Sequence, residues 1–565
     1  MAPKAIVVGS GPGGATAAMV LAEAGYDVVV MEKGDNWYDD LTSESPTSKY
    51  SNDNLKEVRS FAAPDPDFEP RTYRWTAADA KPRAVGAVQV LQQTVGGGAV
   101  HWGADTPRFW DIDFRKLSML GPVPEASVSD WPFTYSELAP YYSKVEELIG
   151  VAGNVDELPE LVLRHAPRAG GLPMPAGPPQ YSSATVAAGC RAMGLHPFPV
   201  PMAINSQPYA GRPACNNCGF CNAYGCPINA RIGALAPLRR AVLAGAEVRA
   251  NAWVVKVLHS GRTATGVQWL DASGQTHTES ADVVVLAAMA IETVRLALLS
   301  ELPDPHSVVG RCFMMHWFTD GSGIWTDRQL GAERGRSITH DCDDFADPDY
   351  PGARDAARAA GLPYFRGGGL ELGGSQDLMS EAMTYAGILK TIAPHKPFGH
   401  EFKDLMRSSV LRNRLAGVSM MGEDLPYERN RVDLDPNVRD YRNLPVARIT
   451  YSPGAYELTA QHFYIPLIAE ILRKAGAQYA TALSAATAPS IPIAGGDVPT
   501  TQHVMGGMRM GGDESASATD GTGRFHQLDN LYVADGSVFP SSGAHNPTLT
   551  IMATAWRNAT AWTSH

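Results

Sequence analysis

Short apolar runs separated by glycine-rich stretches mark the start of the chain. The run AIVV at 5–8 leads into GSGPGG, then into an alanine-rich stretch, then into the run VVVM at 28–31. Apolar runs of this length bounded by turn residues indicate buried strands, and the alanine-rich stretch indicates a helix. The pattern predicts a strand, a glycine turn, a helix and a second strand, as at the start of an α/β fold.

The last part of the chain has a related pattern. Residues 529–562, DNLYVADGSVFPSSGAHNPTLTIMATAWRNATAW, predict a strand, a turn, a loop and a closing helix. Pro547 suits the first position of that helix, because its missing N–H costs nothing there. The positive end of the helix would then point at whatever lies just before Asn546.

The middle of the chain adds a third predicted strand region. Residues 246–288 alternate like a meander of strands and run into VVVLAAMAI, residues 283–291. A membrane span needs about 20 apolar residues, so this run predicts a buried strand that leads into a helix. The Pro/Gly-rich stretches at 63–71 and 167–180 predict loops or lids, and the chain shows no internal repeat.

The glycines of the first turn have a spacing that suits a dinucleotide. Gly9, Gly11 and Gly14 form G-x-G-x-x-G, in which the first permits a tight turn, the second lets a pyrophosphate approach and the third lets helix and strand pack closely. Glu32 ends the second strand, where an acid accepts the ribose hydroxyls. These residues predict an NAD or FAD site, and the acid disfavours the 2′-phosphate of NADP.

Length and charge narrow the class of protein. The 565 residues correspond to roughly three or four domain-sized masses. The net charge of -12 argues against nucleic acid as a partner and leaves room for a neutral or cationic substrate. Met1-Ala-Pro-Lys passes at once into AIVVG, too short for a secretory apolar region, so we expect a cytoplasmic protein with mostly reduced cysteines.

Four blocks of sequence together resemble the glucose–methanol–choline (GMC) oxidoreductase family, in particular its bacterial sugar-oxidising and pyranose oxidase-like branch. The blocks are Gly9–Glu32, Val95–Arg108, 283–300 and His503–Trp556. The resemblance implies an α/β (overall α+β) fold of the GMC and p-hydroxybenzoate hydroxylase type. It has a Rossmann-like FAD-binding domain and a second, substrate-binding domain built on an antiparallel sheet.

The resemblance also implies the catalytic residues. His503 would be the base that takes the hydroxyl proton while the hydride passes to flavin N5, and Asn546 would be its hydrogen-bonding partner, with His545 as the rival partner. An imidazole with a pKa near neutrality suits proton removal, and an amide donor can hold the developing alkoxide.

The glycine-rich stretch VGGGAVHW, residues 95–102, would lie along the flavin, where bare backbone permits close approach. His101 matches the histidine that some family members bond covalently to the flavin 8α-methyl group; the alternative is that it packs beside a noncovalent FAD. Val254 or Val255 is the expected backbone contact to adenine. The full set of expected cofactor contacts is Gly9, Gly11, Gly14, Glu32, Gly97, Gly98, His101, Val255, Asp535, Gly536, Asn546, Pro547 and Thr548.

Four cysteines stand in the pattern C-x2-C-x2-C-x4-C-P, at Cys215, Cys218, Cys221 and Cys226. The spacing is close to a bacterial ferredoxin run, and four thiolates also suit zinc. The favoured reading is that they cap a loop as free thiols or as one or two disulfides, without a metal. Cys190, Cys312 and Cys342 are isolated and predicted to be buried.

The family's domains are discontinuous. We expect residues 1–60, 85–130, 215–310 and 495–565 to form the FAD-binding domain, and 131–214 and 311–494 the substrate-binding domain. One departure concerns the second family signature, which usually has glycine and proline where this chain has Met289 and Val294.

The leading hypothesis is an FAD enzyme that oxidises a hydroxyl group of a sugar or sugar-like polyol, with an amino sugar or aminoglycoside as a special case, and oxygen or another compound as electron acceptor. Two alternatives remain: a redox-neutral lyase that keeps FAD, and a dehydrogenase subunit that passes electrons through a cysteine-bound iron–sulfur cluster to a membrane cytochrome. We expect no nucleic acid partner and no membrane span.

Overall fold

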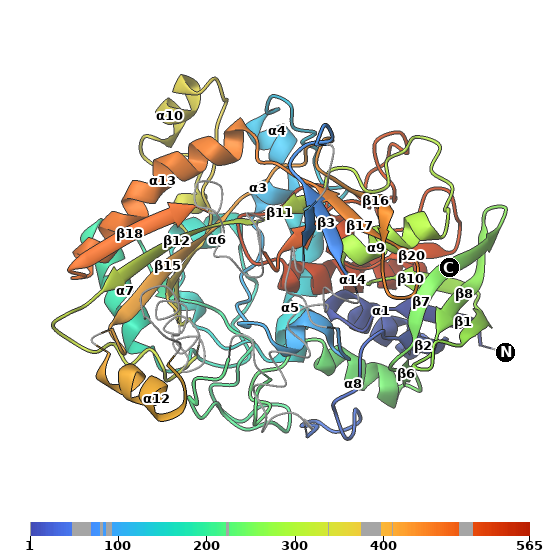
Figure 1. Ribbon diagram of the computed structural model, residues 1–565, viewed down its shortest axis with the longest axis horizontal. Helices are drawn as coiled ribbons and strands as arrows, with labels where there is room; N and C mark the ends of the chain where they lie inside the picture. Colours follow the sequence, from blue (N-terminus) through green and yellow to red (C-terminus); the bar gives the residue numbers. More distant parts are fainter. Residues whose placement is uncertain are drawn as a thin grey trace.

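A parallel β-sheet forms the centre of the nucleotide-binding half of the molecule (Figure 1). The computed structural model describes residues 2–47, 69–79, 83–85, 93–221, 225–336, 338–374, 397–409, 411–484 and 501–564. Five strands pair in parallel, in the order β20 (Leu531–Val533), β10 (Val283–Leu286), β1 (Lys4–Val8), β2 (Asp27–Met31) and β6 (Glu247–Arg249). Both ends of the chain and its middle therefore meet in one sheet, which confirms the strands predicted from the apolar runs.

Helices follow these strands as predicted. α1 (Pro12–Glu23) connects β1 to β2, α9 (Ala290–Leu299) follows β10, and α14 (Thr548–Trp562) closes the chain. α1 packs against α14 and α8 (Leu235–Leu243), and α14 also packs against α5 (Tyr135–Ile149). Pro547 occupies the N-cap of α14, one residue before the helical position predicted for it.

The predicted meander is present as a three-stranded antiparallel sheet of β7 (Trp253–Ser260), β8 (Thr263–Leu270) and β9 (Thr276–Ser280). Its register shifts between Val254 and Lys256. Val255 is therefore an extra residue on β7, at a bulge in the ladder.

A six-stranded antiparallel sheet forms the other half of the molecule. Its strands have the order β18 (Tyr479–Ser484), β12 (Trp317–Ile324), β15 (Leu415–Gly422), β14 (Leu370–Gly373), β13 (His340–Cys342) and β5 (Phe198–Pro199). On β12 the odd-numbered residues are buried, whereas Phe318, Asp320 and Ser322 are partly or fully exposed. This alternation is that of a sheet with one covered and one open face.

Helices α13 (Ala455–Lys474) and α7 (Tyr181–Ala192) cover one face of the six-stranded sheet, as Figure 1 shows at its left. The packing is close: a Cβ on Gly321 would lie 2.5 Å from the Ile468 side chain of α13. The opposite face of the sheet points toward the nucleotide-binding half, where it forms part of a cavity.

Two smaller ladders join the halves. A four-stranded sheet pairs β16 (Arg431–Arg439), β17 (Pro445–Thr450), β3 (Arg71–Arg74) and β4 (Arg83–Val85). A short antiparallel pair joins β11 (Met314–Met315) to β19 (Val504–Met505). The described chain also includes the helices α3 (Asp111–Phe114), α4 (Lys116–Leu120), α6 (Glu160–His165), α10 (Ala353–Ala359) and α12 (Gly399–Ser408).

The predicted division into domains stays a prediction. The strands of the parallel sheet fall in the segments expected for FAD binding, and those of the six-stranded sheet fall in the segments expected for the substrate domain. α5 packs on α14 and α8, although its residues were assigned to the substrate domain. Residues 63–68 of the first predicted loop lie outside the described residues.

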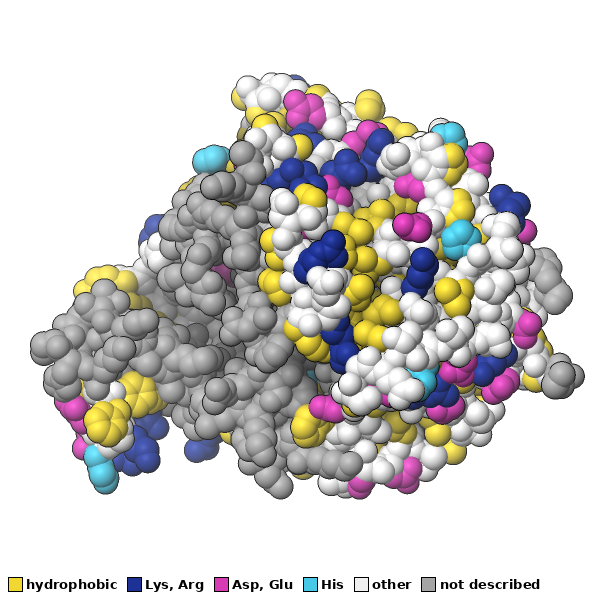
Figure 2. Space-filling model, turned by 45° about the vertical axis from the view of Figure 1, so that its right-hand side comes forward, with side chains coloured by type: hydrophobic (Ala, Val, Ile, Leu, Met, Phe, Trp, Pro, Cys, Tyr) yellow, Lys and Arg dark blue, Asp and Glu magenta, His cyan; other side chains and the backbone are white. Residues whose placement is uncertain are grey.

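Within the described residues, no helix has both the length and the apolar character needed to cross a bilayer. On the face drawn in Figure 2, the described basic and acidic side chains are interspersed over the surface.

Met289 lies at the turn between β10 and α9 and has a φ of 78° and a ψ of 150°. This region of backbone conformation is nearly restricted to glycine. The family resemblance implies glycine at this position. The turn keeps the backbone conformation typical of glycine although Met289 has a side chain. The Met289 sulfur accepts a hydrogen bond from the Ile291 N–H, 3.1 Å away, at the start of α9.

Candidate active site

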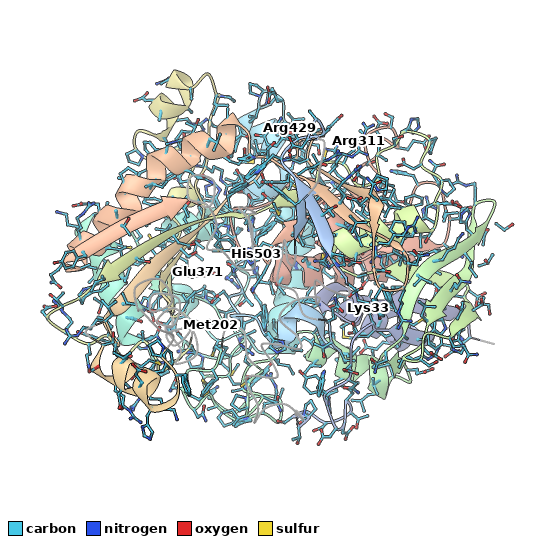
Figure 3. The ribbon with its side chains drawn as sticks, viewed as in Figure 1. Lys33, Met202, Arg311, Glu371, Arg429 and His503 are labelled. Atoms are coloured by element: carbon cyan, nitrogen blue, oxygen red, sulfur yellow. The ribbon has the colours of Figure 1, made fainter. Side chains whose placement is uncertain are left out.

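One cavity of about 780 Å³ runs from the glycine turn after β1 to the open face of the six-stranded sheet. It is lined by residues from both halves of the molecule, among them Gly11, Glu32, Asp535, Asn546, His503 and Glu371. In Figure 3, His503 and Glu371 lie near the centre of the view, whereas Lys33 lies in the nucleotide-binding half. The sequence motifs at the two ends of the chain therefore face one space.

The glycine turn presents bare backbone to the cavity. A Cβ on Gly11 would meet no atom within 4 Å, whereas a Cβ on Gly13 would lie 1.7 Å from the Ala534 carbonyl oxygen. Gly97, with a φ of 57°, would place a Cβ 2.9 Å from the Gly11 Cα. Gly11 is the N-cap of α1, so the positive end of the helix lies at this part of the cavity, as a pyrophosphate requires.

Glu32 holds the glycine turn in place. Its Oε2 accepts hydrogen bonds from the Ser10 N–H at 3.1 Å and the Ser10 hydroxyl at 2.7 Å, and its Oε1 accepts one from the Gly34 N–H at 3.0 Å. A carboxylate has about four acceptor positions. Glu32 lines the cavity and keeps acceptor capacity for ribose hydroxyls beside these three bonds.

The far end of the nucleotide region is formed by β7. Val255 lines the cavity at the bulge in the β7–β8 ladder. Trp253 lies next to it, with the Lys33 ammonium 5.1 Å from its ring centroid. The contact of the Val255 backbone with adenine stays a prediction, and Val255 does line the cavity.

Asp535 links the end of β20 to α9. Its Oδ1 accepts a hydrogen bond from the Ser537 N–H at 2.9 Å, and its Oδ2 accepts one from the Thr293 hydroxyl at 2.5 Å. Burial raises the pKa of Asp535, partly offset by these hydrogen bonds. Asp535 and Gly536 both line the cavity.

Two histidines meet at the other end of the cavity because β11 pairs with β19. Met315 lies opposite Val504 in this ladder, which brings His316 and His503 opposite one another. Their Nδ1 atoms are 3.0 Å apart, and the His316 Nε2 lies 2.8 Å from the Gly543 carbonyl oxygen. His316 was not predicted from the sequence; its only signal is one polar residue within the apolar stretch FMMHW, residues 313–317.

These contacts determine which nitrogen atoms carry protons. A carbonyl oxygen only accepts, so the His316 Nε2 must donate to Gly543. Burial lowers the pKa of His316 to about 4, so near neutral pH its Nδ1 is an acceptor. The His503 Nδ1–H then donates to it, and the His503 Nε2 is left with a lone pair. Burial, together with the nearby His316, holds the pKa of His503 well below its ordinary value.

Asn546 lines the cavity at the N-terminus of α14 and is bound to β14. Its Nδ2 donates to the Glu371 Oε1 at 3.0 Å. Burial raises the pKa of Glu371 to about 7, with a further increase from Asp320, while the hydrogen bond from Asn546 opposes the shift. Glu371 and Asp320 were not identified from the sequence, because short acidic stretches such as LELG at 370–373 carry no motif.

His545 lies elsewhere. It does not line the cavity; its ring centroid is 5.3 Å from that of Trp110, and its Nε2 is 3.1 Å from the Asp343 Oδ2. Asn546 thus faces the cavity and His545 does not, and the catalytic role of His545 stays a prediction.

His101 is buried beside the glycine-rich stretch, while Gly97, Gly98 and Trp102 line the cavity and His101 does not. The Arg231 guanidinium donates to the carbonyl oxygens of Val100 and Trp102, at 3.0 and 2.6 Å, and so fixes the backbone on both sides of His101. Burial, and Arg231 nearby, lower the pKa of His101 to about 3.

All seven cysteines are free thiols, and Cys190, Cys312 and Cys342 are buried as predicted. Burial raises the pKa of Cys221 to about 12. Among the described residues, which leave out 222–224, no group of three or more His, Cys, Asp or Glu side chains is arranged to hold a metal ion.

The sequence and structure of the chain were compared with known proteins. Family models for the GMC oxidoreductases match residues 126–318 and 426–555, and a model for NAD(P)-binding Rossmann-like domains matches residues 7–37. The fructose dehydrogenase large subunit of Gluconobacter japonicus is 30% identical over 491 residues, which cover 84% of this chain and 81% of that protein. The chain belongs to the GMC oxidoreductase family.

Two further similarities agree with this assignment. The 2-methyl-1,2-propanediol dehydrogenase of Mycolicibacterium austroafricanum is 29% identical and aligned over 98% of this chain and 93% of its own length. The crystal structure of pyridoxine 4-oxidase from Mesorbium loti superposes with a TM-score of 0.61 at 16% identity and full coverage of both chains, which shows the shared fold. The chain is an FAD-dependent oxidoreductase of the GMC type that acts on CH–OH groups, and its fold class is confirmed.

The glycine turn allows a test of the cofactor site with two nearly identical substitutions. Gly11→Ala adds a methyl group that enters the cavity without touching the protein, so the flavin-to-protein ratio is expected to fall while the flavin-free protein unfolds like the flavin-free wild type. Gly13→Ala forces a methyl group against the Ala534 carbonyl and is expected to destabilise even the flavin-free protein by about 3 kcal/mol, the usual upper range for overpacking.

Flavin absorbance per mole of protein and thermal unfolding of the stripped proteins are the two measurements. A Gly11→Ala protein that retains a full complement of FAD would place the pyrophosphate elsewhere.

Proposed function

We propose that the protein oxidises a hydroxyl group of a sugar or sugar-like polyol, with His503 as the base that takes the hydroxyl proton. One observation carries the proposal: the hydrogen-bond chain from Gly543 through His316 leaves the His503 Nε2 as an acceptor in the cavity that also contains the glycine turn. Related proteins named as a fructose dehydrogenase and a propanediol dehydrogenase support the substrate class.

Residues from the glycine turn, the glycine-rich stretch, the end of β2 and the bulge of β7 would hold FAD. Gly11 and Gly97 leave room for the pyrophosphate, Glu32 accepts from the ribose, and the Val255 backbone meets the adenine. Gly9, Gly14, Gly98, Asp535, Gly536, Pro547 and Thr548 remain the other expected contacts, and all of these except Gly14 line the cavity. When bound, FAD supplies the acceptor for the hydride of the carbinol carbon.

The chain's own residues manage the proton and the oxygen. The low pKa of His503 keeps its imidazole neutral near neutral pH, so the Nε2 can accept a proton without first losing one. Asn546 has two N–H groups, of which one donates to Glu371. The second would donate to the substrate oxygen and stabilise the charge that develops there as the proton leaves.

Three finer points stay predictions. FAD is bound either covalently through His101 or noncovalently with His101 packed beside it. The electron acceptor is oxygen or another compound. The four-cysteine segment is expected to contain thiols without a metal, with an iron–sulfur cluster or zinc as the alternatives.

Replacement of His503 tests the assignment of the base. His503→Ala should bind FAD as the wild type does and reduce it more than about a hundredfold more slowly under anaerobic conditions with sugars or polyols, because general-base catalysis contributes at least this much. His462→Ala is the matched control, since His462 lies exposed on α13 and its Nδ1–H donates to the Leu458 carbonyl oxygen within the same helix. Near-normal reduction in His503→Ala would reassign the base, and a flavin that stays oxidised with every alcohol would favour a redox-neutral reaction.

His316 is a positioning residue in this proposal, and its test is a pH profile. The pKa of His503 is depressed, so activity is present above that pKa and lost as the pH falls through it. His316→Phe removes both the acceptor for the Nδ1–H and the repulsion that helps to lower this pKa. The acid limb of the rate of flavin reduction is therefore expected to move to higher pH, and the plateau rate to fall roughly tenfold or more as the tautomer is no longer selected.

If His316→Phe lowers the rate of flavin reduction by the same factor at every pH, His316 only supports the local fold. His462→Phe again provides the control, with the wild-type profile expected.

A further inference from the structure

A row of acidic residues crosses the open face of the six-stranded sheet. Asp320 on β12 lies opposite Ser419 on β15, Ser419 lies opposite Glu371 on β14, and Glu371 lies opposite Asp341 on β13. Directly opposed residues of antiparallel strands point to the same face. Three carboxyl groups and one hydroxyl group thus share one face, and we call Asp320, Ser419, Glu371 and Asp341 the acidic row.

Three of the four members of the acidic row form the floor of the cavity, and Asp341 lies behind them in the sheet. Asp320, Ser419 and Glu371 all line the cavity, at the end where His503 lies. The Ser419 hydroxyl donates to the Asp320 Oδ1 at 2.6 Å, and Asn546 donates to the Glu371 Oε1. Within the described residues, the second oxygen of each of these two carboxyl groups has no hydrogen-bond partner from the protein. Like charges opposite one another destabilise a sheet, so this arrangement has no structural benefit of its own.

Asp105 provides a separate observation from another part of the chain. It follows the glycine-rich stretch rather than a strand of the sheet, yet it lines the same cavity. Asp105 is only 5% exposed, and its Oδ1 has no hydrogen-bond partner in the described structure. A buried carboxyl oxygen without a partner is costly unless a ligand satisfies it.

Charge is divided between the two ends of the cavity. Among its described lining residues, the cations are Lys33, Arg71 and Arg295, all at the nucleotide end. Each forms an ion pair there, with Glu69, with Glu292, or with both Glu292 and Asp440. Arg336 is the cation that acts on Asp105, and it forms no ion pair within the described residues.

We propose that Asp320, Glu371 and Asp105 bind a protonated amine, so that the substrate is an amino alcohol, most simply an amino sugar. This inference rests on the proposed function and specifies its substrate class. The amine would donate to the oxygen atoms of Asp320 and Glu371 that lack partners, while the hydroxyl group to be oxidised lies at His503 and Asn546. The 3.0 Å contact between Asn546 and Glu371 joins the two subsites.

The chemistry of the carboxyl groups agrees with this ligand. An ammonium group has three donors and no acceptor, which matches a surface that has acceptors to offer. Burial raises the pKa of Asp320, of Glu371 and of Asp105, with repulsion between neighbouring acids as a further cause at Glu371 and Asp105. A bound cation would favour the ionised forms, so the binding of the amine is expected to release protons to the solution.

The test is an equilibrium titration of the FAD-loaded protein, read as a shift of the flavin absorbance or as heat. The probes are glucosamine, glucose and N-acetylglucosamine, and 1-amino-2-propanol with 1,2-propanediol, at a pH at which the amines are protonated. Glucosamine and the amino alcohol are expected to bind at least about tenfold more tightly than their neutral counterparts, as a charge-assisted hydrogen bond implies.

Isosteric variants locate the effect. Asp320→Asn and Glu371→Gln should each weaken amine binding by about tenfold or more and leave binding of the neutral compounds within about twofold. Asp327→Asn is the matched control, because it removes the same charge from an exposed residue shortly after β12. Wild-type affinity for amines in both cavity variants would overturn the proposal, as would equal binding of amines and neutral compounds, or no binding of any amine, by the wild type.

The titration reads binding, and anaerobic flavin reduction with the same compounds reads turnover. A protein that binds amines selectively but reduces its flavin with no alcohol would contradict the proposed function and support the amine subsite. A protein that binds glucose and glucosamine with equal affinity and oxidises both would support the proposed function and contradict the amine subsite.

Discussion

The close approach of three backbone segments at the carboxyl ends of the parallel strands is the constraint on which the rest of the structure depends. A Cβ on Gly9 would lie 2.4 Å from the Ala287 carbonyl oxygen, and one on Gly13 would lie 1.7 Å from the Ala534 carbonyl oxygen. The ends of β1, β10 and β20 can therefore meet only if no side chain stands between them. This contact brings residues near 10, 290 and 535 around one cavity, which is the position that open parallel sheets use for ligands.

The side chains that give the cavity its chemistry are positioned by a second set of long-range contacts, the pairings of antiparallel strands. The β11–β19 ladder fixes His316 against His503, and the register of β12, β15 and β14 fixes Asp320 and Glu371 on the same floor. The nucleotide end of the cavity thus offers the glycine turn and a helix terminus, whereas the other end offers the His503 imidazole and the carboxyl groups of Asp320 and Glu371. A substrate held between them would meet different chemistry on its two sides, which would orient it.

The sequence predicted most of the first set and little of the second, for a physical reason. Gly9, Gly11, Gly14 and Glu32 lie within one β-α-β unit, where their roles depend on local geometry that spacing reveals. His503 and Asn546 were identified through their resemblance to a family motif. His316 and Glu371 act through partners that lie 187 and 175 residues away along the chain. The register of strands that lie far apart in the sequence is set by tertiary packing, so neither composition nor periodicity predicts it.

The acidic row shows how such a site can be kept at a tolerable cost in stability. Several ionised carboxylates close together on this floor would repel one another, but burial raises the pKa of Glu371 to about 7, so this residue carries a proton for part of the time near neutral pH. The fully ionised floor, in which the carboxylates repel one another most, is then populated mainly when a bound cation offsets that repulsion. The same burial that makes the floor expensive to ionise makes it selective, because a neutral ligand of the same shape recovers none of the electrostatic energy that a protonated amine recovers.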